Sequence, residues 1–370
     1  MKRALQSLGR ALLLGLVRLC YRSSAPGGPI DARALRRLLV IRVDPRVGDV
    51  LLTTPLLRAL RRGLPEARID LLIAAGKEPL VAGLADRLVP FSKKDFFRHP
   101  LRFWRALRAL RRERSDAVIE AAHWHAFSFT SSWLAQATRA PIRIGHDRGE
   151  ARRFLTHAVP KDPQNAREVP SKLELLGPLA IAPAGEALET TVDRAAPVQP
   201  LLDALARLGA GRPWAAFNPG ARKADRRWSP AGFGHLAERL SRELDVTPLS
   251  LWGPGERAIA EAVVAASNGA ARLAPPTNLA ELAAAFRHSA LVVTNDTGPM
   301  HLAVATGAKV LAVLTFEDGP RWTPPDSDHF QGLCVDGVGD VSAQALDRLA
   351  AAARALVAAR AAAPTVDSAD

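Results

Sequence analysis

The sequence predicts an α/β protein made of two doubly wound domains, and three observations support this class. The chain has 370 residues, more than one hydrophobic core usually serves. Short apolar runs rich in β-branched residues alternate with amphipathic stretches, which is the pattern of βαβ units in a parallel sheet. The alternation stops at a segment rich in Pro and Ala and then starts again. Two domains of similar size follow from this pattern.

The first domain is expected over residues 31–185. A buried strand over 38–43, a helix over 49–63 and a second strand over 69–74 form its first βαβ unit. The same alternation continues with helices over 99–115 and 125–138 and with strands over 116–121 and 141–145. Residues 186–200, rich in Pro and Ala, are the expected linker.

The second domain is expected over residues 201–360 and repeats the alternation. Ser229 and Asn278 are expected to cap two of its helices, because their side chains accept hydrogen bonds from free backbone N–H groups. Residues 361–370 are expected to be a disordered tail. The remaining elements are strands over 214–220, 246–253, 290–295 and 309–315 and helices over 229–244, 255–267, 278–289, 296–307 and 341–360.

Residues 1–30 are expected to form an amphipathic basic segment. The apolar run between Arg10 and Arg18 is too short to span a bilayer, which needs roughly 20 apolar residues. Leucines recur on one helical stripe beside several cations, a pattern that suits the surface of an anionic membrane. Packing of this helix against the domain remains an equal alternative.

The charge distribution points to an anionic partner for the first half of the chain. Residues 1–180 carry 33 Lys and Arg against 16 Asp and Glu, although the whole chain has a net charge of only +13. Nucleic acid, an acidic membrane surface and a phosphorylated substrate all fit this excess, as does a general bias of composition toward arginine. The two cysteines, Cys20 and Cys334, offer no disulfide framework, so a reducing cytoplasm is expected.

Function is expected in the turns that follow strands, because doubly wound domains bind ligands at the carboxyl ends of their strands, here in a central cleft. Asp49 follows the first strand and begins a helix, where it is either a general base or a carboxylate stabilised by the helix dipole. Asp296, Thr297 and Gly298 follow another strand and open a helix suited to binding an anion. His301 lies one turn further and could hold a phosphate.

Two more turns add charged side chains to the same cleft. Arg226 belongs to a cationic cluster that suits a diphosphate, and Glu256 begins a helix where its carboxylate could accept hydrogen bonds from a ribose. A solvated charge run is the usual explanation for each turn taken alone. The convergence of four such turns on one cleft favours a nucleotide site.

Four segments together resemble glycosyltransferase family 9, the lipopolysaccharide heptosyltransferases. They are IRVDPRVGDVLLTTPLLRALRR, NPGARKADRRWSP, LWGPGE and VTNDTGPMHLAVATG, and the resemblance spans roughly residues 38–320. Its most specific elements are the D-T-G-x-x-H run at 296–301 and the G-D-x-L-x-T-x-P run at 48–55. The resemblance implies a GT-B fold with an N-terminal acceptor domain and a C-terminal nucleotide-sugar domain.

The resemblance also implies a reaction and roles for the residues of these motifs. The reaction would be an inverting, metal-independent transfer, typically from ADP-heptose, with no cofactor beyond the donor. Asp49 would be the general base, Asp296 would contact the donor sugar and Glu256 the ribose. The diphosphate would be held by Thr297, Gly298 and His301. Arg226 stands where the family usually has Lys, and the loop before Gly48 is one residue longer than usual.

An anionic, lipid-linked saccharide on the inner face of the inner membrane is the expected acceptor, and the protein is expected to be a peripheral enzyme there. Arg42, Arg143 and Arg148, taken to lie on strand ends that face the cleft, are the candidate acceptor-binding residues. A metal site is not expected, because the D-x-D string at 326–328 lies in a Pro-rich loop.

Three other functions stay open at the level of sequence. A nucleic-acid-binding protein would explain the basic charge, but the sequence has no zinc finger or aromatic-rich RNA motif. A catalytically inactive sugar- or nucleotide-binding relative would keep the same motifs. A transferase of the same fold could use another nucleotide-diphosphate sugar.

Overall fold

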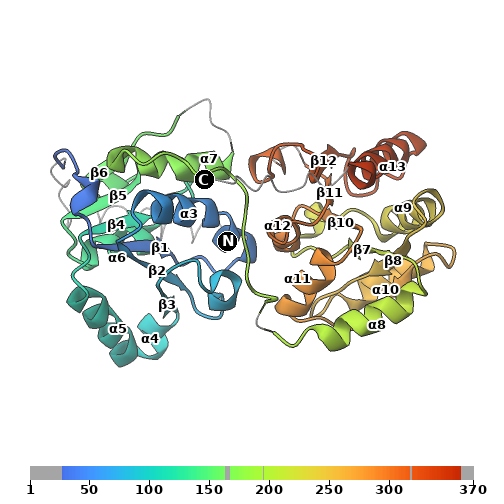
Figure 1. Cartoon of the computed structure of the whole chain (residues 1–370), viewed down its shortest axis with the longest axis horizontal. Coiled ribbons are helices and arrows are strands. Elements are labelled where there is room, and N and C mark those ends of the chain that lie inside the picture. The colour runs from blue at the N-terminus through green and yellow to red at the C-terminus, as the bar shows by residue number, and fades with distance from the viewer. Residues whose placement is uncertain (1–26, 163–166, 195, 317–318, 360–370) are drawn as a thin grey trace, which may run out of the picture. The chain divides into compact units, whose positions relative to one another are not determined.

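The computed structural model describes residues 27–162, 167–194, 196–316 and 319–359, which form two compact units (Figure 1). The boundary between the units falls between Thr191 and Val192, inside the segment 186–200. Most of the basic segment predicted for residues 1–30, and the tail predicted for 361–370, lie outside the described residues.

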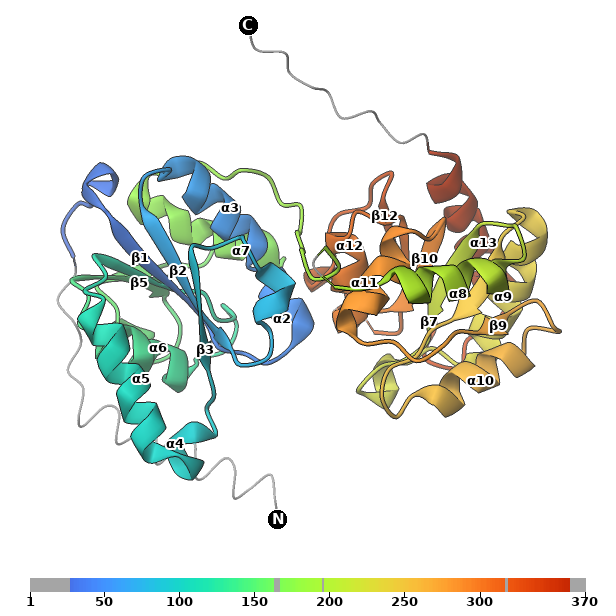
Figure 2. The same ribbon diagram turned by 60° about the horizontal axis from the view of Figure 1, so that its bottom comes forward.

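Unit 1 contains a six-stranded parallel sheet with the strand order β3-β2-β1-β4-β5-β6. Helices α5 and α6 pack on one face of this sheet, and α3 and α7 lie on the other face (Figure 2). The strands are β1 (Arg37–Arg42), β2 (Arg68–Ala74), β3 (Arg87–Phe91), β4 (Ala117–Glu120), β5 (Ile142–His146) and β6 (His157–Val159). The helices are α2 (Val47–Leu51), α3 (Thr54–Gly63), α4 (Asp95–Arg98), α5 (Pro100–Arg112), α6 (Phe129–Ala137) and α7 (Glu168–Leu173).

Unit 2 contains a second six-stranded parallel sheet, with the order β12-β11-β10-β7-β8-β9. Helices α9 and α13 cover one face through a core that includes Phe217, Phe233 and the fully buried Trp228. The strands are β7 (Trp214–Asn218), β8 (Thr247–Ser250), β9 (Arg272–Leu273), β10 (Leu291–Asn295), β11 (Val310–Leu314) and β12 (Phe330–Cys334). The helices are α8 (Gln199–Gly209), α9 (Pro230–Glu243), α10 (Arg257–Ala265), α11 (Leu279–Arg287), α12 (Gly298–Ala305) and α13 (Ala343–Ala358).

Both sheets have the same winding, and the winding indicates where a ligand site is expected in each unit. In unit 1 the chain builds outward from β1 through β2 to β3, then returns to the other side of β1 with β4. In unit 2 it builds outward from β7 and returns beside it with β10. Doubly wound sheets bind ligands at the carboxyl ends of the two strands where the winding reverses. The sites to inspect are therefore the ends of β1 and β4 and the ends of β7 and β10.

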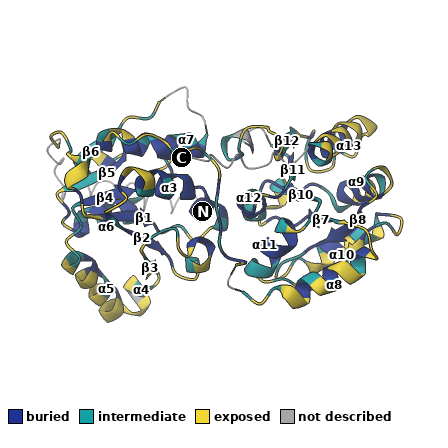
Figure 3. Cartoon of the chain, viewed as in Figure 1, coloured by how far each residue is buried: buried dark blue, intermediate teal, exposed yellow. Residues whose placement is uncertain are grey.

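The central strands form where the sequence predicts them, because their side chains are buried on both faces. Every residue of β10 and β11 is buried, as is every residue of β1 except Arg37 (Figure 3). Ser229 and Asn278 cap α9 and α11 as expected, and Asn278 forms a reciprocal capping box with Glu281.

Two helices differ from the prediction. The helix expected over 49–63 is two helices, α2 and α3, because the Thr53 hydroxyl donates to the Asp49 carbonyl, the Thr54 hydroxyl donates to the Leu51 carbonyl, and Pro55 has no N–H. Helix α8 begins at Gln199, inside the segment expected to be linker. Among the described residues, none of the helices is long and apolar enough to cross a bilayer.

Candidate active site

Asp49 lies at the point in unit 1 where the winding of the sheet reverses. It belongs to the short helix α2, which follows the carboxyl end of β1, and it is only 5% exposed. Burial of a carboxylate requires compensating hydrogen bonds and opposite charge, because the ionised form loses its hydration. The neighbouring side chains of unit 1 supply both.

Arg42 is the first of these neighbours and is completely buried at the end of β1. Its Nε donates to the backbone carbonyl of Asp49 at 2.9 Å, and its Nη1 donates to the carbonyl of Ala121 at 2.9 Å. Its Nη2 lies 3.5 Å from Asp49 Oδ1. Arg42 therefore joins the ends of β1 and β4 to helix α2 and supplies the nearest fixed positive charge to Asp49.

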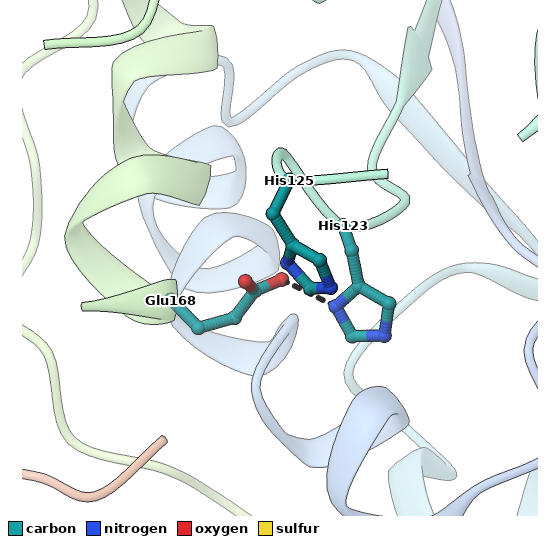
Figure 4. A group of neighbouring side chains, drawn as sticks. All are labelled: His123, His125 and Glu168. Carbon is teal, nitrogen blue, oxygen red and sulfur yellow. Dashed lines mark hydrogen bonds and ion pairs between the residues drawn. The ribbon is translucent and has the colours of Figure 1, made fainter. Parts of the chain in front are cut away.

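His123, just after β4, connects Asp49 to a second buried carboxylate. Its Nε2 lies 3.2 Å from Asp49 Oδ1 and its Nδ1 lies 2.8 Å from Glu168 Oε1. Figure 4 shows the second of these contacts as a dashed line between His123 and Glu168. Glu168 also accepts a hydrogen bond from Lys172 Nζ at 2.8 Å, one turn along α7. Asp49, His123, Glu168 and Lys172 thus form one continuous polar chain.

The two carboxylates of this polar network, Asp49 and Glu168, are held in the ionised form. Burial alone would raise the pKa of Asp49, but the hydrogen bond with His123 and the charges of Arg42 and Arg46 outweigh it and hold that pKa well below its usual range. Burial is likewise outweighed at Glu168, where Lys172 and His123 keep the pKa low. Burial, together with the charge of Arg42, lowers the pKa of Lys172 to about 8, despite its partner Glu168.

The two oxygens of Asp49 have different surroundings. Oδ1 faces His123 and Arg42, whereas Oδ2 accepts no hydrogen bond from the described residues. The nearest charge to Oδ2 is Arg46, whose Nη1 lies 3.7 Å away on a largely exposed side chain. Oδ2 is itself buried, so a bound hydroxyl reaches it only if a covering side chain such as that of Arg46 moves aside. Once reached, an ionised carboxylate that is held in orientation through one oxygen can accept a proton on the other.

Some of the side chains in this polar network have the spacing of metal ligands. One potential ligand atom from each of His123, His125 and Glu168 lies within 4.8 Å of the others (Figure 4). However, Lys172 already contacts Glu168 at 2.8 Å, and Arg42 Nη2 lies 3.1 Å from His123 Nε2. Two cations beside the ligand atoms oppose a further positive charge. This residue set therefore suits an ion-pair network better than a metal.

In unit 2, Asp296 lies at the end of β10 and pairs with Arg226. The Arg226 Nη1 is 3.5 Å from Asp296 Oδ2, and the guanidinium group also lies over the Phe316 ring at 4.1 Å. Burial raises the pKa of Asp296 to about 6, and the charge of Arg226 only partly opposes that rise. The Asp296 side chain is thus poised between acid and carboxylate near neutral pH.

The residues after Asp296 form the start of helix α12. Gly298 is the first helical residue and Pro299 follows it, so the missing N–H of proline falls where a helix has no internal acceptor for it. The Thr297 hydroxyl donates to the Asn295 carbonyl at 3.3 Å and makes no capping hydrogen bond to the helix. His301 is buried one turn later. The N–H groups of Met300 and His301 donate to the Thr297 carbonyl and Pro299 has none, so it is the Gly298 N–H at the start of α12 that is available to an anion.

Glu256 lies beside the turns that follow β7 and β8. Its Oε2 accepts a weak hydrogen bond from the Gly253 N–H at 3.4 Å. A Cβ placed on Gly220 would come within 2.3 Å of that same oxygen, so the carboxylate occupies space that only a glycine at 220 leaves open. Asn295, the last residue of β10, holds the turn after β7 in place. Its side-chain amide donates to the carbonyl of Pro219 and accepts a hydrogen bond from the N–H of Trp228.

The predicted acceptor-binding arginines have different positions. Arg143 is the second residue of β5, and its Nη1 donates to the Ala140 carbonyl, so the expectation that it lies at a carboxyl end of the sheet is wrong. Arg148 does follow the carboxyl end of β5, but it is buried and bonds Glu120 at 2.6 Å. Arg42 has no exposed surface, so contact with an acceptor would require it to leave its present bonds.

The sequence interpretation missed three members of the Asp49 network. His123 carried a usable signal, because it follows a predicted strand in the same way as Asp49 does. Glu168 and Lys172 did not, because their helix α7 is short, contains Pro170 and was not predicted. Only the folded chain brings Glu168 to His123, which is 45 residues away in sequence.

Comparisons with known proteins identify the family of the chain. The family model described as glycosyltransferase family 9 (heptosyltransferase) matches residues 103–338. Lipopolysaccharide heptosyltransferase 3 of Escherichia coli is 26% identical over 310 residues, which cover 77% of this chain and 85% of that protein. The lipopolysaccharide core heptosyltransferase OpsX of Haemophilus influenzae is 20% identical over 304 residues, covering 80% and 84%.

Solved structures share the fold. A family 9 glycosyltransferase from Veillonella parvula superposes with a TM-score of 0.70 at 22% identity, covering 89% of this chain and 99% of that one. The E. coli heptosyltransferase WaaC with ADP gives a TM-score of 0.63 at 18% identity, covering 87% and 99%. The predicted fold class, two doubly wound α/β domains of the GT-B type, is confirmed.

Proposed function

The chain belongs to glycosyltransferase family 9, the heptosyltransferases, and from that premise we propose that it moves a heptose from ADP-heptose onto a lipopolysaccharide core or a related anionic glycolipid. We propose further that the transfer inverts the anomeric centre, needs no metal and uses Asp49 as general base. The observation that carries the proposal is the buried, ionised Asp49, whose Oδ1 is held by His123 and Arg42 while Oδ2 accepts no hydrogen bond from the described residues.

In the proposed reaction, Asp49 Oδ2 takes the proton of an acceptor hydroxyl as its oxygen attacks the anomeric carbon of the donor. The bond between that carbon and the diphosphate oxygen breaks as the new one forms, so a single displacement inverts the anomeric centre. A low pKa weakens Asp49 as a base toward a free alcohol. The proton transfer is therefore coupled to formation of the new bond, which makes the attacking hydroxyl strongly acidic.

Residues of unit 2 are proposed to bind the donor. Negative charge gathers on the leaving diphosphate, and the start of α12 with Thr297 and Gly298, together with His301 and Arg226, would stabilise it without a metal. Asp296 would contact hydroxyls of the sugar, and Glu256 would accept hydrogen bonds from the ribose. The position of Asp296, Arg226 and Glu256 at the ends of neighbouring strands supports these roles.

The acceptor assignment rests on charge and on the named relatives. Lys and Arg exceed Asp and Glu about twofold in residues 1–180, which suits a phosphorylated core saccharide and an anionic membrane. Both curated relatives described above are named as lipopolysaccharide heptosyltransferases.

A thermal-shift panel tests the donor assignment. The full chain is melted with ADP, UDP, GDP or CDP in the presence of EDTA, because a ligand that binds only the folded state raises the melting temperature. We expect a selective rise with ADP that EDTA does not remove. Preference for another nucleotide would overturn ADP-heptose as donor, and a requirement for added metal would overturn metal independence. No shift with any nucleotide would favour an inactive relative.

A further inference from the structure

Helices α4 and α5 expose large apolar side chains at the edge of unit 1. Phe96, Leu101 and Trp104 are 47%, 74% and 46% exposed, and they are three of the five large hydrophobic side chains that the described residues expose. All three fall within nine consecutive residues. Figure 3 shows both helices largely exposed on their outer sides. Exposed apolar side chains concentrated in one short segment mark interaction surfaces more often than scattered single ones do.

The inner face of α5 already supplies the core. Phe96 and Trp104 each place their ring against core Phe103, at 5.1 and 5.8 Å between centroids, while remaining about half exposed, and Leu101 is additional to the core. Phe103, Leu107 and Leu110 are buried against the sheet, and Phe103 stacks on Trp133 at 6.1 Å. Leu101 lies on the opposite face of α5, since it is two positions from Phe103 and aligns with residues four, seven and eleven positions later. Folding of the unit therefore does not require Leu101 to be apolar.

The residues aligned with Leu101 are arginines. Arg105, Arg108 and Arg112 are exposed and make no ion pair with the described residues. Between residues 93 and 114 the chain has nine Lys and Arg against two acidic side chains. Both acids are already engaged, since Asp95 contacts Arg102 at 3.4 Å and Glu113 contacts Arg87 at 2.7 Å. The positive charge of this surface is thus not neutralised within the protein.

We propose that this surface docks the protein on an anionic phospholipid bilayer. We call it the α4–α5 surface and define it by Phe96, Arg98, Leu101, Trp104, Arg105, Arg108 and Arg112. Guanidinium groups bind lipid phosphates in a planar, paired geometry, and Trp beside aliphatic side chains inserts at the level of the headgroups. An anionic bilayer therefore offers phosphates to the arginines and apolar surroundings to Phe96, Leu101 and Trp104.

Other partners satisfy only part of this surface. Nucleic acid would engage the arginines and stack on Trp104, but it offers nothing to Leu101, the most exposed apolar side chain of the three. The inference deepens the proposed function and rests on it in one respect, since a glycolipid acceptor lies in such a membrane. It is distinct from the membrane contact predicted for residues 1–30, because the α4–α5 surface belongs to the folded unit.

Co-sedimentation of the full chain with vesicles tests the proposal. The vesicles are phosphatidylcholine with or without phosphatidylglycerol. Replacing Arg105, Arg108 and Arg112 by Gln should weaken binding to the anionic vesicles at least about tenfold, since each interfacial Arg favours an anionic surface appreciably. Leu101→Ser combined with Trp104→Ser should also weaken it, and added salt should lower wild-type binding. The matched control replaces Arg194, Arg207 and Arg348, exposed arginines of unit 2, by Gln and should bind as wild type does.

Each alternative result overturns a stated part of the proposal. Unchanged vesicle binding by the α5 variants would assign the membrane contact to other residues, such as 1–26. Variants that lose retention on single-stranded DNA but not on vesicles would identify a nucleic-acid surface instead. Wild-type protein that binds no vesicle but turns over ADP-heptose would overturn the docking alone. Vesicle binding without any turnover of ADP-heptose would overturn the proposed function alone.

Discussion

At the scale of single residues, the orientation of Asp49 depends on His123. Replacing His123 by Gln breaks a bridge between two buried carboxylates, because a single amide cannot reproduce the two opposed nitrogens of the ring. We expect kcat to fall about 10- to 100-fold, with the KM for the donor nearly unchanged because the proposed donor residues belong to unit 2. Steady-state kinetics of acceptor-dependent ADP release measures both quantities.

The neighbouring His125 provides the matched control. It is exposed, and its ring centroid lies 5.1 Å from that of His123. His125→Gln should leave kcat within about twofold of wild type, a change that corresponds to only a few tenths of a kcal/mol. If kcat fell equally in the two variants and an added divalent metal restored it, the histidines and Glu168 would bind a metal ion. That result would contradict our interpretation of these residues as an ion-pair network.

The pKa of Asp296 is raised, whereas that of Asp49 is lowered, so the contribution of Asp296 to the stability of the protein depends on pH. Its pKa is raised by burial to about 6, above the ordinary value of 3.8, so the folded protein binds the proton more tightly than the unfolded chain does. Its contribution to stability is therefore fully present below about pH 4 and is lost as the pH rises through 6. Asp296→Asn should raise the free energy of unfolding at pH 8, by up to about 3 kcal/mol, and leave it nearly unchanged at pH 4.

Urea unfolding of Asp296→Asn at the two pH values measures that difference. The same variant should bind the donor more weakly, because the proposed sugar contact changes. A gain in stability of the same size at pH 4 and pH 8 would show that the effect comes from packing and not from the buried charge.

At the scale of elements, the turn after β7 controls the position of Glu256. A methyl group on Gly220 would overlap Glu256 Oε2, so Gly220→Ala should displace the carboxylate from the proposed ribose site. We expect the Kd for ADP, measured by calorimetry, to rise about tenfold, in line with the loss of one hydrogen bond to a charged group. Gly209→Ala is the control, because a Cβ there meets no atom within 4 Å. The same Kd in both variants would exclude a role for Glu256 in nucleotide binding.

The elements also explain what sequence could and could not predict. Strands such as β10 and β11 were predictable because they are buried on both faces and consist of continuous apolar runs. The break between α2 and α3 was only partly predictable, since Pro55 is visible in the sequence whereas the bonds of two threonine hydroxyls to backbone carbonyls exist only in the folded chain. The strands β3, β6, β9 and β12 were not predicted either; β3 and β6 are only partly buried and β9 has two residues.

The same distinction applies to the candidate site. Asp49 and Asp296 were predictable because each follows a strand that the apolar pattern defines. Their opposite pKa shifts were not predictable, because they depend on partners that only folding brings together. The distant His123 acts with the nearby Arg42 and Arg46 to lower the pKa of Asp49, whereas burial, opposed only by Arg226, raises that of Asp296. Local sequence determines where a carboxylate lies in a βα unit, whereas packing between distant segments determines its charge.

At the scale of the whole molecule, the two units divide the proposed reaction between them. Each has its own sheet and core, and all proposed donor residues belong to unit 2. An isolated segment covering residues 192–359 should therefore fold and bind ADP within about threefold of the affinity of the full chain. Calorimetric titration of both proteins checks this. A folded segment that does not bind ADP would show that residues of unit 1 complete the nucleotide site.

The proposed mechanism depends on Asp49 more than on any other residue, and one comparison of rates tests its role. ADP release from ADP-heptose is measured with a heptose-deficient lipopolysaccharide acceptor and EDTA, for wild type and for Asp49→Asn. We expect ADP release to require the acceptor and to be about 10²- to 10⁴-fold slower in the variant, while the variant binds ADP as tightly as wild type does. A variant that folds, binds ADP and turns over at the wild-type rate would show that Asp49 is not the general base.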